Sequence, residues 1–172
     1  GGYKLNEFDG DISRWDVSNV TNMKGMFHGS NFKGRNGDIS KWDVSNVTNM
    51  EDMFAYSKPS GISLSSWDVS NVENMNSMFQ GAKHFYGAGV DNWDVSNVKD
   101  MSYMFDSCKQ FYISLSKWNL NKLEKCEYMF TYCTDLCKDF SMWDVTNIKH
   151  NKMFYYCPVN KHKEYWPKGY VK

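Results

Sequence analysis

The chain has 172 residues, of which 17% are aromatic, and its 20 basic and 20 acidic side chains cancel to a formal net charge of zero. This balance argues against a nucleic-acid partner, because binding to nucleic acid depends on a basic face that neutralises phosphates. It also gives no electrostatic reason to expect an anionic membrane as a partner. No apolar run approaches the roughly 20 residues that a membrane span needs. The chain begins at Gly1 without an initiator Met, so we expect a fragment or a processed product.

A hexapeptide repeat dominates the sequence. Trp-Asp-Val-Ser-Asn-Val occurs four times unchanged, and altered copies follow at two further Trp residues. The intervals between the six Trp residues are 27, 25, 26, 25 and 25 residues. A fixed period of this length is typical of a solenoid, in which one structural unit is stacked on copies of itself. We therefore predict a single array of six repeats over residues 1–157 and a C-terminal cap or tail over residues 158–172. The repeats start at Trp15, Trp42, Trp67, Trp93, Trp118 and Trp143.

Each repeat predicts one strand and one short helix. An apolar residue stands three positions before each Trp, between small or polar neighbours, which is typical of a short strand with one buried face. After the Trp, apolar residues such as Val20, Met23 and Met26 follow the spacing of one helical stripe. Ser18 precedes this stripe and suits a helix N-cap. The sequence thus predicts an α/β repeat solenoid, with a parallel β-sheet on one face and short helices on the other. The six predicted strand residues are Ile12, Ile39, Leu64, Val90, Leu115 and Phe140.

The repeat resembles a known family. The pattern Asp-Ile-Ser-x-Trp-Asp-Val-Ser-Asn-Val-Thr-Asn-Met-x-x-Met-Phe is present over residues 11–27 and 38–54. It is similar to the BspA-type leucine-rich repeat of bacterial and mycoplasmal surface lipoproteins, which also occurs in protists and large viruses. The resemblance covers residues 8–157. It implies a right-handed coil of the leucine-rich-repeat type that works in adhesion or protein–protein contact and has no catalytic residues.

The last two copies depart from this pattern. Residues 120–123 read Leu-Asn-Lys-Leu in place of Val-Ser-Asn-Val, and Cys126 stands where Met is usual. The sixth copy has Asn151 at that Met position and reaches Met153 one residue early. These changes predict a drift toward a capping unit.

Three of the five cysteines occupy one repeat position. Cys108, Cys133 and Cys157 stand where the earlier copies have Ser or Ala, which favours a small residue packed in a tight column. A disulfide between adjacent copies is sterically conceivable, but the odd count and the Ser and Ala residues argue against it. A zinc site that uses Cys137 and a nearby His lacks a paired Cys-x-x-Cys spacing.

An Asp or Asn follows every repeat Trp, and this column has two interpretations. Stacked carboxylates could chelate calcium, or each side chain could accept N–H bonds from the turn that follows. Like charges about 5 Å apart in water repel by less than about 1 kcal/mol, so the column is tolerable without metal. Asn119 in the fifth copy favours the turn role, since Asn accepts the same bonds without charge. We predict no metal and no cofactor. The Asp residues of the column are Asp16, Asp43, Asp68, Asp94 and Asp144.

No pattern points to catalysis. The four His residues occupy unrelated repeat positions, and neither a Ser–His–Asp arrangement nor a Gly-rich phosphate loop is present. We expect a protein that is not an enzyme and has no catalytic residues.

The partner-binding surface is predicted on the exposed sheet face and on the irregular loops. Successive units of a solenoid present one continuous surface, and loops that vary on a constant scaffold are frequent recognition sites. The predicted sheet-face residues are Asp11, Ser13, Arg14, Asp38, Ser40, Lys41, Ser63, Ser65, Asp91, Asn92, Ser114, Ser116 and Lys117. The predicted loop residues are Phe32, Phe85 and Tyr86.

Two functions are compatible with these features. The first is an adhesion or interaction module, displayed on a cell or virion surface, that binds a protein or glycan on a host cell or matrix. The alternative is a structural or scaffold component of a virion or cell envelope that assembles through the ends of the solenoid. The first repeat begins close to Gly1, so Phe8, Ile12 and Trp15 are expected to be exposed there and to allow end-to-end association.

Overall fold

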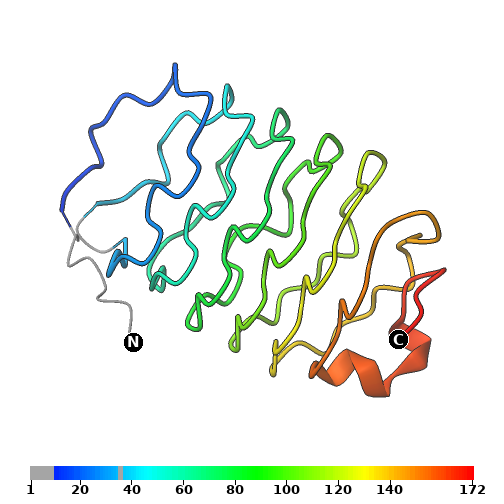
Figure 1. Cartoon of the computed structure of the whole chain (residues 1–172). Helices are drawn as coiled ribbons and strands as arrows, with labels where there is room; N and C mark the ends of the chain where they lie inside the picture. Colours follow the sequence, from blue (N-terminus) through cyan, green and yellow to red (C-terminus); the bar gives the residue numbers. More distant parts are fainter. Residues whose placement is uncertain (1–9, 35–36) are drawn as a thin grey trace.

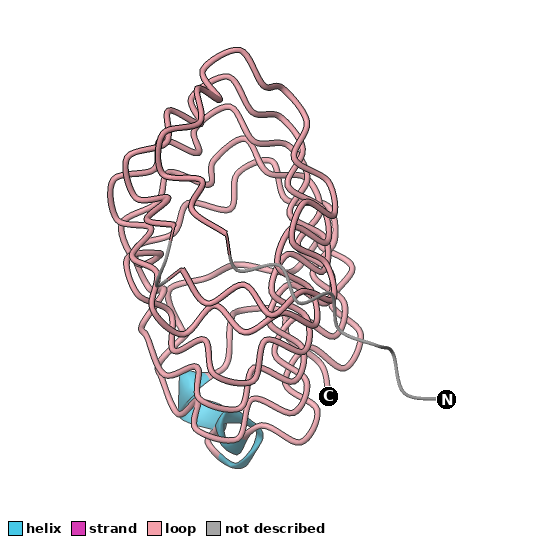
Figure 2. Cartoon of the chain, turned by 90° about the vertical axis from the view of Figure 1, so that its left-hand side faces the viewer, coloured by secondary structure: helices cyan, strands magenta, loops and turns pink. Residues whose placement is uncertain are grey.

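The computed structural model describes residues 10–34 and 37–172 and shows a backbone that winds through successive coils, one for each repeat (Figure 1). Seen from the side at which the chain starts, the coils lie one behind another (Figure 2). The predicted start of the array at residue 1, and Phe8, lie outside the described residues. We number the coils 1 to 6 after their Trp residues: Trp15, Trp42, Trp67, Trp93, Trp118 and Trp143.

The predicted α/β architecture is wrong. Over residues 10–34 and 37–172 the secondary structure consists of two 3₁₀ helices, η1 (Pro158–Lys161) and η2 (Lys163–Tyr165), with no α-helix and no strand. The parallel sheet is replaced by isolated parallel bridges, one for each step from coil to coil. No helix in this part of the chain is long and apolar enough to cross a membrane. The bridges between coils are Asn22↔Asn49, Asn49↔Asn74, Asn74↔Asp100, Asp100↔Lys125 and Lys125↔Lys149.

Turns take the place of the predicted helix because two of its residues have left-handed backbone angles. In coil 1 these are Gly25 and Gly29, with φ of 65° and 63°. Each is the third residue of a turn, as in a type II turn, and an α-helix cannot continue through such a residue. The two turns are closed by bonds from Met26 N–H to the Met23 carbonyl (3.2 Å) and from Ser30 N–H to the Phe27 carbonyl (3.1 Å). The residues with the same sign of φ in later coils are Asp52, Tyr56, Ser77, Gly81, Tyr103, Ser107, Tyr128, Tyr132, Lys152 and Tyr156.

Because of the left-handed residues, every second backbone N–H in these turns points to the next coil. Met23, Gly25 and Phe27 each donate an N–H to a carbonyl of coil 2 at 2.8 Å, and the same pattern continues to coil 6. The segment predicted as a strand is instead a turn, closed in coil 2 by Trp42 N–H and the Ile39 carbonyl (3.1 Å). Ile39 is buried as expected. The alternation of apolar and polar residues before each Trp therefore predicted the buried residue correctly. It predicted a strand wrongly, since the segment forms a turn.

Stacked aromatic rings fill the space that each coil encloses. One Phe from each coil stands in a column whose neighbouring ring centroids are 5.3 to 5.7 Å apart. Beside this column, each Trp of coils 2 to 6 donates its indole N–H to a carbonyl of the preceding coil. The bond from Trp67 Nε1 to the Ile39 carbonyl, for example, is 2.9 Å long. The column consists of Phe27, Phe54, Phe79, Phe105, Phe130 and Phe154.

The C-terminal segment packs against coil 6. Lys168 exchanges backbone hydrogen bonds with Trp143 and Val145, each 2.9 Å long, and the ring of Tyr170 meets Phe154 edge-on at 5.2 Å. Between its Trp and its bridge residue, coil 6 is one residue shorter than coil 5, so that Lys149 pairs with Lys125. The usual Met position is consequently filled by His150 and not by Asn151 as predicted. His150 Nε2 lies 3.1 Å from the Gly169 carbonyl, so this substitution joins coil 6 to the C-terminal segment.

Alanine substitutions at two glycines, one close to the neighbouring coil and one in open space, test how closely the coils pack. A Cβ at Gly89 would lie 2.3 Å from the backbone N of Ser65 in the neighbouring coil, whereas a Cβ at Gly29 would meet nothing within 4 Å. Both have positive φ. Gly29→Ala should cost only the left-handed strain of about 1–2 kcal/mol. Gly89→Ala should cost about 2–5 kcal/mol, because overpacking is added to the strain. Equal losses in urea unfolding would contradict the close approach of these coils.

Candidate functional site

Tyrosines gather on the turns of the last coils. We call this surface the tyrosine edge and define it by Tyr103, Tyr128, Tyr132, Tyr155 and Tyr156. The rings of Tyr103 and Tyr128 stack at 4.9 Å, and those of Tyr132 and Tyr156 stack at the same distance. Tyr132 is 44% exposed, Tyr155 39% and Tyr156 60%, whereas Tyr103 and Tyr128 are half-buried. A large aromatic surface is therefore available at one edge of the stack.

Four of these tyrosines occupy left-handed positions at which Gly would cost less. The left-handed backbone costs a non-glycine residue roughly 1–2 kcal/mol, while a stacked aromatic pair returns about 0.5–1.5 kcal/mol. Stacking therefore offsets only part of the strain of two residues. Gly25 and Gly29 fill the equivalent positions in coil 1, so the turns do not need Tyr. Strained residues that persist where a simpler residue would serve are a reason to look for function.

Charged groups border the tyrosine edge. Lys152 Nζ lies 6.0 Å from the ring centroid of Tyr128 and 5.5 Å from that of Tyr155, within the range of a cation–π interaction. Burial raises the pKa of Tyr103, and Tyr128, Glu127 and Asp106 add to this effect. The Tyr103 hydroxyl thus stays protonated at neutral pH and can donate a hydrogen bond.

The predicted sheet-face residues lie in turns before each Trp. Several of their polar groups are used within the turn: Asp11 Oδ1 accepts the backbone N–H of Ser13 at 2.9 Å, and Asp38 Oδ1 accepts that of Ser40 at the same distance. Ser13, Ser40 and Asp91 are half-buried. The remaining side chains of the set are exposed, so the coils present them as a polar surface. These exposed residues are Asp11, Arg14, Asp38, Lys41, Ser63, Ser65, Asn92, Ser114, Ser116 and Lys117.

The prediction for the loop aromatics is wrong for Phe32 and Phe85. Both are buried, because their rings turn inward and stack on the Phe column, on Phe27 at 4.3 Å and on Phe79 at 4.1 Å. They cannot contact a partner directly. Tyr86 is 39% exposed, and its ring stacks on a neighbouring tyrosine at 6.2 Å. At the start of the array, Ile12 is also buried, whereas Trp15 is 54% exposed.

The Asp column has the predicted turn role. Asp43 Oδ1 accepts the backbone N–H of Ser45 at 3.1 Å and its hydroxyl at 2.6 Å. Asn119 Oδ1 accepts the N–H of Asn121 at 3.1 Å in the same geometry, without a charge. The hydrogen bonds from Ser45 lower the pKa of the Asp43 carboxyl.

The Asp column predicts that the folded state loses stability in acid. Since the folded-state pKa of Asp43 is lowered, its contribution to stability is complete above the ordinary Asp pKa of about 3.9 and is lost as the pH falls through the folded-state value. Asp43→Asn should keep the turn bond and weaken the dependence of the unfolding midpoint on pH below about 4. Asp43→Ala should lower the midpoint at pH 7. A pH profile of thermal unfolding in which all three proteins coincide would contradict the turn role.

The cysteine column is a packing feature. Cys108 and Cys133 are buried as free thiols, and each donates its S–H to a carbonyl of the preceding coil at 2.9 Å. Burial raises the pKa of both thiols well above the ordinary value and raises that of Cys157, the third member of the column, to about 12. A thiol that stays protonated is a poor nucleophile and a poor metal ligand. The column therefore serves the core, as predicted.

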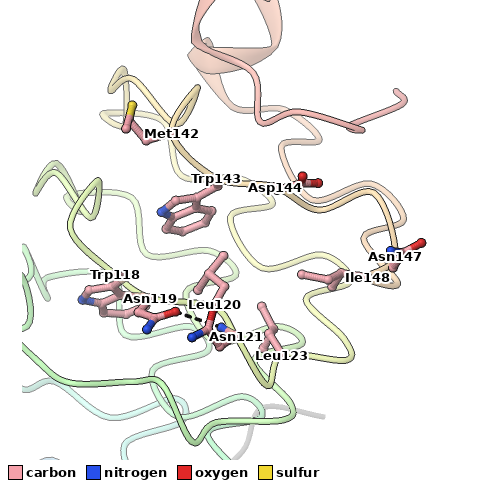
Figure 3. Close-up of a pocket in the computed structure, with 10 residues that line it drawn as sticks. All are labelled: Trp118, Asn119, Leu120, Asn121, Leu123, Met142, Trp143, Asp144, Asn147 and Ile148. Atoms are coloured by element: carbon pink, nitrogen blue, oxygen red, sulfur yellow. Dashed lines mark hydrogen bonds between the residues drawn. The ribbon is translucent and has the colours of Figure 1, made fainter.

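A cavity of about 430 Å³ opens between coils 5 and 6. Figure 3 shows Trp118, Asn119 and Leu120 on one coil, with Trp143 and Asp144 on the next. The sequence pointed to this region only through its altered repeats. The other residues that line the cavity are Asn121, Leu123, Met142, Asn147 and Ile148.

Comparison with known proteins gives a family and no function. The chain matches the family described as "Mycoplasma protein of unknown function, DUF285" over residues 3–83 and 57–166. The chain belongs to this family. No curated protein and no solved structure matches the chain. Membership in the family thus agrees with a repeat protein and assigns no activity.

The tyrosine edge was missed in the sequence although a signal for it exists. Tyr103 and Tyr128 both stand ten residues after their Trp, and Tyr132 stands fourteen residues after its Trp. A recurrence at fixed offsets from the Trp indicates a column of side chains in a stacked array. The degree to which these rings are exposed follows only from the turns, which the helix prediction did not include.

Proposed function

We propose that the protein is a non-enzymatic interaction module that binds a protein or glycan partner, with the tyrosine edge as the centre of the contact. The observation that carries the proposal is the stacked, exposed pair of Tyr132 and Tyr156 at positions where the backbone favours Gly. The exposed ring of Tyr155 and the half-buried rings of Tyr103 and Tyr128 complete the tyrosine edge. Tyrosine is enriched in the energetically dominant part of interfaces, because it combines a large apolar area with a polar hydroxyl.

The stack suits this role because its surface is pre-organised. Consecutive Phe rings 5.3 to 5.7 Å apart and the backbone bonds between coils fix the position of each turn. A rigid surface loses little conformational entropy on binding, so more of the contact energy appears as affinity. The exposed Ser, Asp and Lys side chains before each Trp offer a second, polar surface that a wide partner could contact.

The resemblance of the repeat to the BspA type favours adhesion as the form of this interaction. Repeats of that type occur in surface lipoproteins, and display on a cell or virion surface is the setting in which we expect the module to act. Under this proposal the partner is a protein or glycan of a host cell or its matrix.

Replacing two tyrosines tests the proposal. Ser107 occupies in coil 4 the position that Tyr132 occupies in coil 5, so Ser is compatible with this backbone. Tyr132→Ser combined with Tyr156→Ser should leave the fold intact and weaken partner binding by more than about tenfold, as expected for the loss of an interface hot spot. Binding is measured on an array of glycans and purified matrix proteins with the full chain.

The matched control replaces the stacked pair Tyr86 and Tyr112 by Ser. These two tyrosines are also exposed, 39% and 48%, but lie outside the tyrosine edge. The proposal places the contact at the tyrosine edge and not at Tyr86, which the sequence predicted as a loop contact, so the control should bind like the unaltered chain. If both double variants bind equally well, or if only the control loses binding, the tyrosine edge is not the contact.

A second candidate function is supported by the first coil. Trp15 is 54% exposed, whereas the Trp residues of coils 2 to 6 are buried, and Met26 beside it is 36% exposed. A cavity of about 600 Å³ is lined by Trp15, Val20 and Met26 together with neighbouring residues of the same coil. An exposed apolar patch of this kind favours association. The protein would then act as a scaffold component that assembles through this end.

Sedimentation velocity tests the scaffold function. If the end associates, the chain should show a concentration-dependent increase in mass that Trp15→Lys abolishes, because burying a charge without a partner is costly. Met142→Lys is the control, since Met142 is 80% exposed on another coil. A monomer at all concentrations, or association unchanged by Trp15→Lys, would exclude this candidate.

A further inference from the structure

The cavity between coils 5 and 6 lies where a ladder of Asn side chains is interrupted. The Asn four residues after the Trp donates its Nδ2 to a carbonyl of the preceding coil in coils 2 to 4. Asn71, for example, bonds to the Ser45 carbonyl at 2.8 Å. In coil 5 the position is Lys122, whose Nζ lies 2.7 Å from Asn97 Oδ1. Coil 6 has Asn again, Asn147, but in the described part of the chain no such bond links it to coil 5.

The C-terminal segment holds the turn of coil 6 from the other side. Lys168 makes two backbone bonds of 2.9 Å to this turn, and its Nζ lies 2.6 Å from Asp144 Oδ2. Gly169 lies so close that a Cβ there would be 2.5 Å from the Cα of Thr146. The turn of coil 6 is thus held by the C-terminal segment, although, among the described residues, Asn147 makes no bond to coil 5.

The lining combines an apolar wall with a neutral polar rim. Leu120, Leu123 and Ile148 line the space with small parts of two buried indoles, while the side chains of Asn119 and Asn147 are exposed at its border. An amide side chain both donates and accepts hydrogen bonds. The Asp144 carboxylate is neutralised by Lys168, so the site offers no net charge to a charged ligand. The volume of about 430 Å³ is within the range of small-molecule sites, roughly 300–1,000 Å³.

We propose that this cavity binds a neutral pyranose residue that carries an N-acetyl group, an N-acetylhexosamine. The C–H face of the ring and the acetyl methyl would lie against the apolar wall. The ring hydroxyls and the acetamido group would exchange hydrogen bonds with the amides of Asn119, Asn121 and Asn147. This inference rests on the proposed interaction function and names a glycan element for it, at a site separate from the tyrosine edge.

Titration of the ¹⁵N-labelled full chain with N,N′-diacetylchitobiose tests the inference. The expected result is saturable shifts of the Asn147 and Ile148 signals, with a dissociation constant on the order of 1 mM. Glucose should bind at least about fivefold more weakly, and glucuronate should not bind. Asn147→Leu and Ile148→Trp, which remove a rim amide and fill the cavity, should each weaken binding at least about tenfold.

Asn71→Leu is the matched control at the same repeat position in coil 3. It breaks a ladder bond and should lower stability, yet leave sugar binding unchanged, whereas Asn147→Leu should lower binding without a comparable loss of stability. Absence of saturable shifts with a folded chain overturns the inference. Binding that survives both cavity variants overturns it as well, since the sugar then binds elsewhere.

The outcome is separable from that of the proposed function. If the tyrosine variants abolish partner binding while chitobiose does not bind, only the cavity inference fails. If chitobiose binds in the cavity while the tyrosine variants retain partner binding, the tyrosine edge fails and the cavity inference stands.

Discussion

The fold depends on backbone hydrogen bonds that run from one coil to the next. Residues with positive φ, such as Gly25 and Gly29, turn alternate N–H groups out of the coil and toward the carbonyls of its neighbour. A single coil would leave these groups and its Phe ring exposed. Each coil is therefore stable only between others, which is the condition that defines a repeat array.

The same turns determine the surface. A left-handed position exposes its side chain in some coils, as at Tyr132 and Tyr156, and covers it in others, as at Ser77. Where coil 1 has Gly29, coil 5 has Tyr132, so the backbone stays constant while the surface changes from bare to aromatic. Coil 6 adds a second variation. It is one residue shorter after its Trp and is held by Lys168, and the cavity lies between it and coil 5. Both candidate sites arise from changes of side chain, while the backbone hydrogen bonds between coils continue through coil 6.

Sequence reasoning predicted the repeat, the buried columns and the turn role of the Asp residues, since these follow from spacing and side-chain chemistry. It failed on secondary structure, because apolar residues at Val20, Met23 and Met26 have helical spacing yet can equally line two successive turns. Gly25 and Gly29 in coil 1 indicated left-handed turns, but the tyrosines at the same repeat positions in coils 4 and 5, Tyr103 and Tyr128, do not. Phe32 was misplaced because its burial depends on rings of two coils, Phe27 of its own coil and Phe54 of the next.

Hydrogen exchange of the indole N–H groups tests the central claim most directly. Five of them, in coils 2 to 6, donate to a carbonyl of the preceding coil and are buried, whereas Trp15 is exposed. A ¹⁵N spectrum in D₂O should show five slowly exchanging indole signals from coils 2 to 6 and a fast one that is missing in Trp15→Phe. The seventh indole, that of Trp166, donates to the Val159 carbonyl in the C-terminal segment and is identified by Trp166→Phe. If the indoles of coils 2 to 6 exchange as fast as that of Trp15, the coils are not joined in this way and the account is wrong.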